Sequence, residues 1–289
     1  MPLPAGGSTD ILARVVAQKF SDGLGKSFIV DNRPGAGTSL GNELVARATP
    51  DGYTLLFASA SIATNVPLYP KLPFHPIRDY TPIGTVGQSF YVLIVQPSLG
   101  VNSVQELITL AKAKPQLIQY ASAGQGTITH MAVELFMMNA QIKMQNVPFK
   151  GGAPALIGFM SGEVPVIFSP IAESLPYFRN GTKVRPLAVT ASNRVPDLPD
   201  VPTLAETGVP DSIVMSRTSI LSAKGTPENV VKILNTELNR FLQQPDTRER
   251  ISSHGLIPAG GTPAELTEYL KMEIERWTKV VKTVGIKVE

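Results

Sequence analysis

The 289-residue sequence contains no cysteine, and its other shortages are equally informative. Without cysteine the chain can form no disulfide, no thiolate nucleophile and no cysteine-ligated metal site. Apolar runs such as residues 92–95 fall far short of the roughly 18 residues that a membrane-spanning helix needs. The 26 Lys and Arg residues are interspersed with 23 Asp and Glu residues. No block of like charge forms, which argues against a nucleic-acid-binding protein.

The usual signatures of catalysis are also missing. His75, His130 and His254 lie far apart, and none has a second ligand at metal-binding spacing. There is no Gly-x-Ser-x-Gly elbow and no phosphate loop ending in Gly-Lys-Ser/Thr. The glycines of residues 35–41 have a spacing similar to that of a dinucleotide fingerprint, but Asn32-Arg33-Pro34 separates them from the preceding apolar run. We therefore expect no metal, no cofactor and no enzyme activity, with residues 35–41 as a structural loop.

What the sequence does contain is an alternation of short β-branched or aromatic runs with longer amphipathic segments. The runs at residues 28–30, 53–57, 91–95, 164–168 and 187–190 are typical of strands. Residues 227–243 and 263–284 are the longest helical patterns, and each begins at a Thr-Pro pair. At roughly 100–200 residues per domain, the length predicts two α/β domains.

Two glycine-bearing loops each lead directly into a helix, at residues 4–10 and at residues 122–127. Glycine lets the backbone approach a ligand, and the free N–H groups of a first helical turn favour an anion. Both loops are therefore candidate carboxylate sites. The alternative is that the glycines only make tight turns and that Ser8, Thr9 and Thr127 are helix caps with nothing bound.

These loops belong to a series of motifs that spans nearly the whole chain. It includes Pro-Ala-Gly-Gly-Ser-Thr-Asp at residues 4–10, Asp-Asn-Arg-Pro-Gly-Ala-Gly at 31–37, and Pro-Asp-Gly-Tyr-Thr-Leu-Leu at 50–56. Tyr-Ala-Ser-Ala-Gly-Gln-Gly-Thr at 120–127, Val-Pro-Phe-Lys-Gly at 147–151 and Leu-Pro-Asp-Val-Pro-Thr at 198–203 follow in order. In these motifs the sequence closely resembles the Bug (TctC-type) extracytoplasmic solute receptors of tripartite tricarboxylate transporters.

The resemblance implies an α/β, two-lobe fold of the periplasmic-binding-protein kind, similar to type II, in which the chain crosses between lobes twice. The crossings are expected near Ser98 and Ser222, so residues 1–98 and 223–289 form the first lobe and residues 99–222 the second. It further implies a periplasmic monomer that binds a small di- or tricarboxylate or aromatic acid in the interlobe cleft. The expected partners are the membrane subunits of the transporter.

The resemblance also places ligand-binding residues in both loops, one from each lobe. Polar residues at neighbouring strand ends are further candidates. The complete expected set is Ala5, Gly6, Gly7, Ser8, Thr9, Asp10, Ser59, Ser61, Ser89, Phe90, Ser122, Gly124, Gly126, Thr127, His130, Ser169 and Arg217.

Two departures from the family pattern bear on the choice of ligand. Ser169 stands where amino-acid-binding members commonly carry an aspartate, and Arg217 stands where an aromatic or apolar residue is usual. A guanidinium can hold a carboxylate through two hydrogen bonds. We therefore expect a dianion, or an aromatic acid with a second polar end, rather than a zwitterion. The alternative for Arg217 is a surface residue or one paired with an acidic side chain.

A third departure is at the start, where family members carry a signal peptide and a strand ahead of the Pro-Ala-Gly-Gly motif. Here Pro2-Leu3-Pro4 follows Met1 at once, so we expect either a gene start assigned too late or a truncated relative that lacks the first strand of the first sheet. Two other functions remain open on sequence grounds. One is a receptor that presents its ligand to a sensor; the other is an enzyme with Asp10 or His130 as its catalytic base.

Overall fold

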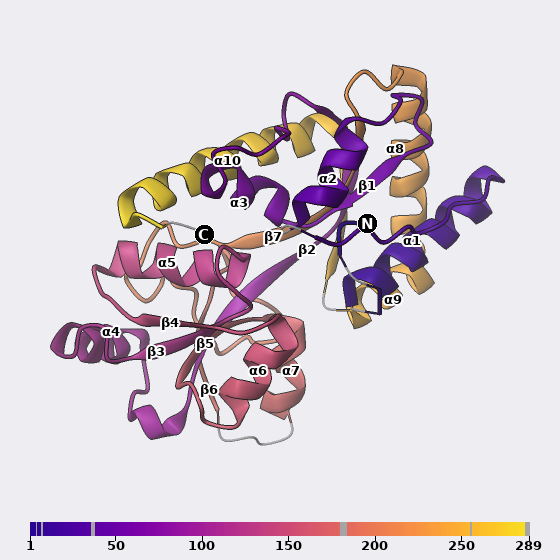
Figure 1. Ribbon diagram of the computed structural model, residues 1–289. Coiled ribbons are helices and arrows are strands. Elements are labelled where there is room, and N and C mark those ends of the chain that lie inside the picture. Colours follow the sequence, from indigo (N-terminus) through magenta and orange to yellow (C-terminus); the bar gives the residue numbers. More distant parts are fainter. Residues whose placement is uncertain (4, 7, 36–37, 180–183, 255, 287–289) are drawn as a thin grey trace. The chain divides into compact units, whose positions relative to one another are not determined.

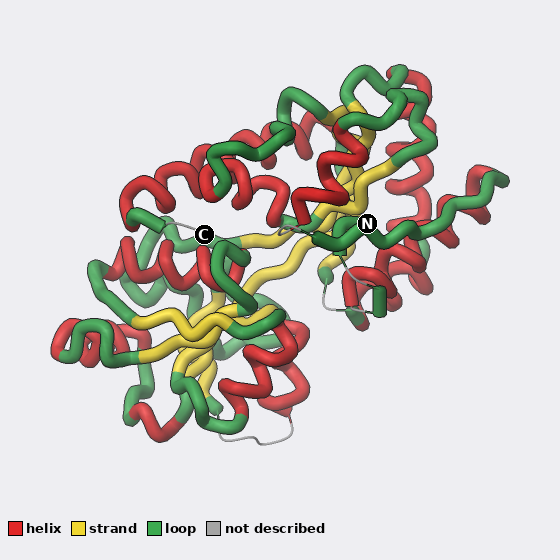
Figure 2. Tube along the Cα trace, in the orientation of Figure 1, coloured by secondary structure: helices red, strands yellow, loops and turns green. Residues whose placement is uncertain are grey.

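The computed structural model describes residues 1–3, 5–6, 8–35, 38–179, 184–254 and 256–286. The chain divides into two compact units. Unit 1 comprises Met1–Gln88 with Ser216–Thr278, and unit 2 comprises Ser89–Met215 with Lys279–Glu289. We expected the chain to cross between units near Ser98 and Ser222. The first two boundaries in the structure come earlier, after Gln88 and after Met215. Both units are built from strands with helices around them (Figures 1 and 2).

Unit 1 carries an antiparallel sheet. Strand β1 (Leu55–Ala58) pairs with β7 (Met215–Ala223), β7 neighbours β2 (Tyr80–Val95), and β2 pairs with β8 (Ile257–Gly260) through residues 85–88. Its helices are α1 (Ser8–Leu24), α2 (Ser39–Ala46), α3 (Ser61–Leu68), α8 (Glu228–Leu242), α9 (Pro245–Ser253) and the first part of α10 (Pro263–Val284). Apolar residues of α1, β2 and α8, including Phe20, Ile83 and Phe241, form one buried cluster. This cluster holds α1 and α8 on the sheet.

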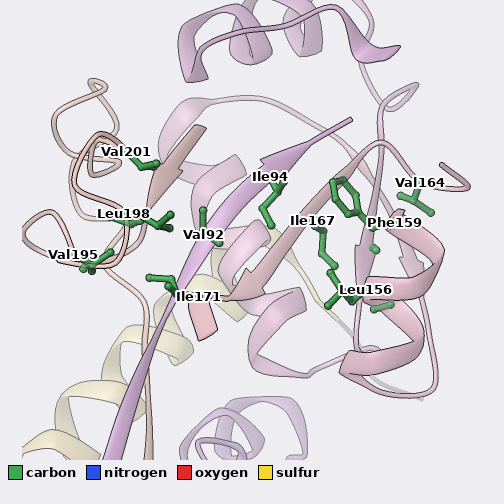
Figure 3. Packing of buried hydrophobic residues seen from close by; sticks show 14 residues of the cluster. Val92, Ile94, Leu156, Phe159, Val164, Ile167, Ile171, Val195, Leu198 and Val201 are labelled. Carbon is green, nitrogen blue, oxygen red and sulfur yellow. The ribbon is translucent and has the colours of Figure 1, made fainter. Parts of the chain in front are cut away.

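Unit 2 carries a mixed sheet. Residues 91–95 of β2 pair antiparallel with β5 (Val166–Pro170) and β6 (Arg185–Val189), and β3 (Gln119–Ser122) pairs parallel with β5 and with β4 (Gln145–Pro148). Its helices are α4 (Val104–Ala113), α5 (Ile128–Ala140), α6 (Gly152–Met160) and α7 (Ile171–Arg179), and a 3₁₀ turn spans Pro97–Leu99. Figure 3 shows the core, in which Val92, Ile94 and Ile167 of the sheet meet Leu156 and Phe159 of α6.

The predicted α/β class and most predicted elements are confirmed. Helix α10 begins at Pro263, one residue after Thr262, because a complete capping box starts it there. The Glu265 amide donates to Thr262 Oγ1 at 3.2 Å, and the Thr262 amide donates to Glu265 Oε2 at 2.7 Å. No helix in the described part of the chain is long and apolar enough to cross a bilayer.

The strand predicted at Phe28-Ile29-Val30 is wrong, because these residues form no strand in the structure. A strand needs a neighbour for its backbone groups. The Phe28 amide donates instead to the Ser21 side chain at 2.9 Å. Further along, Met1 makes two backbone hydrogen bonds with this segment: its amino group donates to Asp31 O at 3.0 Å, and its carbonyl accepts from the Arg33 amide at 2.8 Å.

Candidate functional site

In unit 1, Asp10 ties the first glycine-bearing loop to the segment that follows α1. Its carboxylate accepts from the Gly6 amide at 3.0 Å, from Asn32 Nδ2 at 2.9 Å and from Arg14 Nε at 3.0 Å. The backbone bond from Gly6 lowers the pKa of Asp10 most, followed by the Asn32 amide, and the value falls to about 2. Asp10 is 3% exposed and its oxygens are occupied by the protein itself. It therefore positions the loop and is not shaped to act as a base.

The other described residues of this loop lie at the start of α1. Ala5 and Gly6 are exposed, and Gly6 has a φ of 88°. Ser8 and Thr9 are the first residues of α1. Gly7 lies outside the described residues. In a first helical turn the backbone N–H groups have no acceptor within the helix, which favours an anion there.

A cluster of hydroxyl groups lies at the start of α3 in unit 1. Ser61 Oγ is 2.7 Å from Ser59 Oγ and 3.1 Å from Thr38 Oγ1. The neighbouring Thr64 hydroxyl is completely buried, and no described residue hydrogen-bonds it. The structure thus brings the predicted Ser59 and Ser61 together and adds Thr38, which the sequence analysis missed.

Gly41 of the predicted structural loop at residues 35–41 has a structural role within unit 1. A Cβ on Gly41 would lie 2.8 Å from the carbonyl oxygen of Arg33 and 2.8 Å from the Cα of Pro2. These contacts are too close for any side chain. Gly41 therefore lets α2 approach the backbone of its neighbours, while residues 36 and 37 lie outside the described residues.

In unit 2, the second glycine-bearing loop is closed by side chains of α5. The Ala123 amide donates to Thr129 Oγ1 at 2.9 Å, and Thr127 Oγ1 donates to Gly124 O at 2.6 Å. Gly124 and Gly126 have φ values of 128° and 76°, which favour glycine. The loop thus has a defined shape before any ligand binds, and Thr129 is a part of it that the sequence analysis missed.

His130 also holds this loop in place through hydrogen bonds. Its Nδ1 accepts from the Gly126 amide at 3.1 Å, and its Nε2 lies 3.3 Å from Glu134 Oε1. The Tyr120 hydroxyl donates to the same Glu134 oxygen at 2.8 Å, and burial, with the Glu134 charge, raises the pKa of Tyr120. The bonds assign the proton of the imidazole to Nε2. With both nitrogens engaged, His130 positions the loop.

Ser122 and Ser169 come together at a small cavity in unit 2. Both are buried, at 0% and 2% exposure, and Thr129 and Gly152 line the same space. Its volume is about 10 Å³, close to what one water molecule requires. The cavity can therefore hold one water behind the loop but no carboxylic acid. The other two predicted residues of this region, Ser89 and Phe90, lie in β2, and Phe90 packs on the core of unit 2.

Arg217 lies on β7 in unit 1 and stacks on an aromatic ring. Its guanidinium carbon is 4.1 Å from the centre of the Tyr269 ring of α10. Its Nε is buried and finds no hydrogen-bond partner among the residues that the structure describes. Within the same residues Arg217 makes no ion pair, although Glu265 and Glu273 are near enough for its charge to act on both. The guanidinium is thus held over Tyr269, and its Nε donor is unused within the described part of the chain.

Three contributors had little or no sequence signal. Asn32 lies within the motif at residues 31–37 but was not a predicted site residue, and its side chain bridges Asp10 and the Leu3 carbonyl. Thr129 is one residue into a helix and could have been found as a second hydroxyl beside Thr127. Tyr269 is far from Arg217 in sequence, and only the fold brings them together.

The family comparison covers nearly the whole chain. The family model described as "Tripartite tricarboxylate transporter family receptor" matches residues 12–286. Among curated relatives, Protein BugT of Bordetella pertussis is 34% identical, with 100% of this chain aligned to 89% of its length. The UPF0065 protein of the tcbD-tcbE intergenic region of Pseudomonas sp. strain P51 is also 34% identical, over 97% of this chain and 84% of the relative.

Solved structures agree with this assignment. Rpa4515 of R. palustris with adipate has a TM-score of 0.85 at 36% identity, over 99% of this chain and 96% of the other. MatC of Rhodopseudomonas palustris with bound malate has a TM-score of 0.83 at 31% identity, over 97% of this chain and 96% of the other. The periplasmic binding protein BugD has a TM-score of 0.83 at 30% identity, over 100% and 97%. The fold is the two-lobe fold of these binding proteins, and the chain belongs to the tripartite tricarboxylate transporter family of receptors, also called TctC.

Proposed function

We propose that this protein is a periplasmic receptor that binds a small dicarboxylate and delivers it to the membrane subunits of a tripartite tricarboxylate transporter. In this role it acts as a monomer, without a cofactor and without converting its ligand. Family membership supports the receptor role. The adipate and malate of two similar structures support a dicarboxylate as the ligand class.

The observation that carries the ligand class is the state of Arg217. A cation whose Nε is buried without a partner is costly to keep. A carboxylate would supply the missing acceptor, and a charge-assisted hydrogen bond contributes about 1.5–3 kcal/mol. The glycine-bearing loop before α1, which belongs to the same unit as Arg217, offers N–H donors for one carboxylate group. We assign Arg217 to the second carboxylate of the same ligand.

Isothermal titration calorimetry with adipate and malate tests this proposal directly. Acetate, citrate and glutamate serve as mono-, tri- and zwitterionic comparisons. We expect a dicarboxylate to bind best, and Arg217→Ala to weaken it at least tenfold, which corresponds to about 1.4 kcal/mol. Arg248→Ala is the matched control, because Arg248 is exposed and its replacement removes the same positive charge. Equal affinity in the Arg217→Ala variant would remove the arginine from the site.

Two further measurements separate the receptor from its alternatives. After long incubation, the bound acid should be recovered unchanged, and any turnover would establish an enzyme. Co-purification from membranes should recover transporter subunits in the presence of ligand. Recovery of a sensor kinase in their place would contradict the transport role.

A further inference from the structure

Thr38, just before α2, has a backbone conformation that is unfavourable for its residue type. Its φ is 81° and its ψ is −8°, in the left-handed region. A β-branched side chain is crowded there, so threonine has a free-energy cost at this position that glycine would not have. Three other non-glycine residues among those described have a positive φ, and none of them is β-branched. Residues held in such a conformation cluster at functional sites, which directs attention to the Thr38 side chain.

The hydroxyl of Thr38 accepts hydrogen bonds from two buried amides. Asn42 Nδ2 of α2 donates to Thr38 Oγ1 at 3.4 Å, and Asn65 Nδ2 of α3 donates to the same oxygen at 3.5 Å. Both bonds are long, and their common direction is what matters, with the amide orientations that these bonds assign. A hydroxyl has one proton and two acceptor sites. Because both acceptor sites face these amides, the proton of Thr38 is left for its third neighbour, Ser61.

From Ser61 the hydrogen bonds continue in the same direction. Ser61 Oγ is 3.1 Å from Thr38 Oγ1 and 2.7 Å from Ser59 Oγ. Because Ser61 accepts the proton of Thr38, it donates its own proton to Ser59. Within the described part of the chain the Ser59 hydroxyl has no further hydrogen-bond partner, and Ser59 is partly exposed. This hydroxyl relay of Thr38, Ser61 and Ser59 therefore ends on a proton that is available to an acceptor outside it.

We propose that Thr38 is a positioning residue that makes Ser59 a hydrogen-bond donor to a carboxylate oxygen of the ligand. This inference rests on the proposed dicarboxylate receptor. The relay lies in unit 1, as do Arg217 and the glycine-bearing loop before α1. A hydroxyl with an available proton favours a group that accepts, and carboxylate oxygens only accept. Hydrogen bonds aligned in one direction also polarise one another, which strengthens the last bond of the relay.

Two single variants and their combination test the hydroxyl relay by calorimetry with adipate and malate. We expect Ser59→Ala to weaken binding at least about fivefold, because it removes the donor. Thr38→Gly removes the start of the relay and should weaken binding about three- to tenfold. If both residues act through the same bond to the ligand, the double variant should bind within about twofold of Ser59→Ala. Thr38→Ser keeps the hydroxyl and should bind within about twofold of the original protein.

Thermal unfolding separates positioning from a purely structural role. In Thr38→Gly, relief of the left-handed conformation offsets the lost hydrogen bonds, so its Tm should stay within about 2 °C of the original. Affinity should thus fall without a matching loss of stability. Gln141→Gly is the matched control, because Gln141 is exposed, has a φ of 54° and lies in unit 2. This variant should bind the dicarboxylate within about twofold of the original.

Two results would overturn the proposal. One is full affinity for the dicarboxylate in Thr38→Gly, which would make Thr38 a structural residue only. The other is a double variant whose loss of affinity equals the product of the two single losses, because residues that act through one bond are not additive. Both results leave the assignment of Arg217 in place. Failure of the original protein to bind adipate or malate would instead contradict the proposed function, and this inference with it.

Discussion

The guanidinium of Arg217 stacks on the ring of Tyr269, with 4.1 Å between the guanidinium carbon and the ring centre. The ring faces the cation with its negative π-surface, a contact that contributes about 0.5–2 kcal/mol. A side chain held over a ring has fewer rotamers open to it. The stacking therefore pre-orients the arginine, so that less rotamer freedom is lost when a carboxylate binds.

Replacement of this ring tests the orientation. We expect Tyr269→Leu to weaken dicarboxylate binding about three- to tenfold, because the arginine loses its stacking partner. Tyr269→Phe retains the ring and should bind within about twofold. Calorimetry with adipate measures both variants, and a Tyr269→Leu variant that binds as tightly as Tyr269→Phe would show that stacking does not matter.

The second prediction concerns His130 and the glycine-bearing loop at residues 122–127. His130→Ala removes the acceptor of the Gly126 amide, and a hydrogen bond of this kind contributes about 0.5–1.5 kcal/mol. We expect the loop to lose its shape and ligand affinity to fall about two- to tenfold. His130→Asn offers a carbonyl oxygen near the position of Nδ1 and should recover part of the affinity.

Comparison of His130→Ala with His130→Asn separates positioning from proton transfer. A positioning residue is rescued by any acceptor for the Gly126 amide, so the Asn variant should bind more tightly than the Ala variant. An equal loss of affinity in both variants would contradict the positioning role.

The third prediction concerns the loss of stability of unit 1 at low pH. The pKa of Asp10 is lowered to about 2 in the folded protein, below the value of about 3.9 of an unfolded aspartate. The unfolded chain therefore takes up the proton first, and the stabilisation from Asp10 is complete above about pH 4 and lost as the pH falls toward 2. At pH 7 the Asp10→Asn variant should have a lower free energy of unfolding than the original protein. Between about pH 4 and pH 2 its free energy of unfolding should fall by less.

Urea unfolding at pH 7, 4 and 3, followed by the fluorescence of Trp277, makes this comparison. The sequence has one tryptophan, and it is fully buried in unit 1, so the signal reports this unit. Parallel pH curves for the two proteins would show that Asp10 does not carry the acid sensitivity.

The sequence predicted the α/β class, most strands and the helix starts, because these depend on local patterns. The β-branched run at residues 91–95 places Val92 and Ile94 in a core strand, and the Thr-Pro pairs mark where α8 and α10 begin. The strand at residues 28–30 failed for a physical reason. Its composition is typical of a strand, but a strand exists only beside a partner, and the pattern of one segment does not report whether a neighbour is present.

The site was predictable only in part for a related reason. Glycine-bearing loops before helices can be found from spacing alone, and the structure shows both at helix starts. Which groups remain free for a ligand depends on contacts distant in sequence. Asp10 is occupied by Asn32 and Arg14, Ser169 faces a cavity of water size, and Arg217 depends on Tyr269.

The fourth prediction tests the capping box that begins α10. Thr262→Ala removes the acceptor of the Glu265 amide and frees the Glu265 carboxylate from one of its two partners at Thr262. The cost of losing such a cap is about 1 kcal/mol. Thr267→Ala is the control, because the Thr267 hydroxyl only bonds the Pro263 carbonyl one turn back and alanine favours helix.

We expect Thr262→Ala to lower the free energy of unfolding of unit 1 by about 1 kcal/mol and Thr267→Ala to leave it unchanged or raise it slightly. Trp277 lies in the same helix and reports the transition. Arg217 lies over Tyr269, which belongs to this helix. The buried residues of α10, Leu266 and Leu270 among them, should keep Tyr269 in place even when the first turn at Thr262 frays. Dicarboxylate affinity should therefore be the same in both variants, and a loss confined to Thr262→Ala would show that the start of α10 orients Arg217.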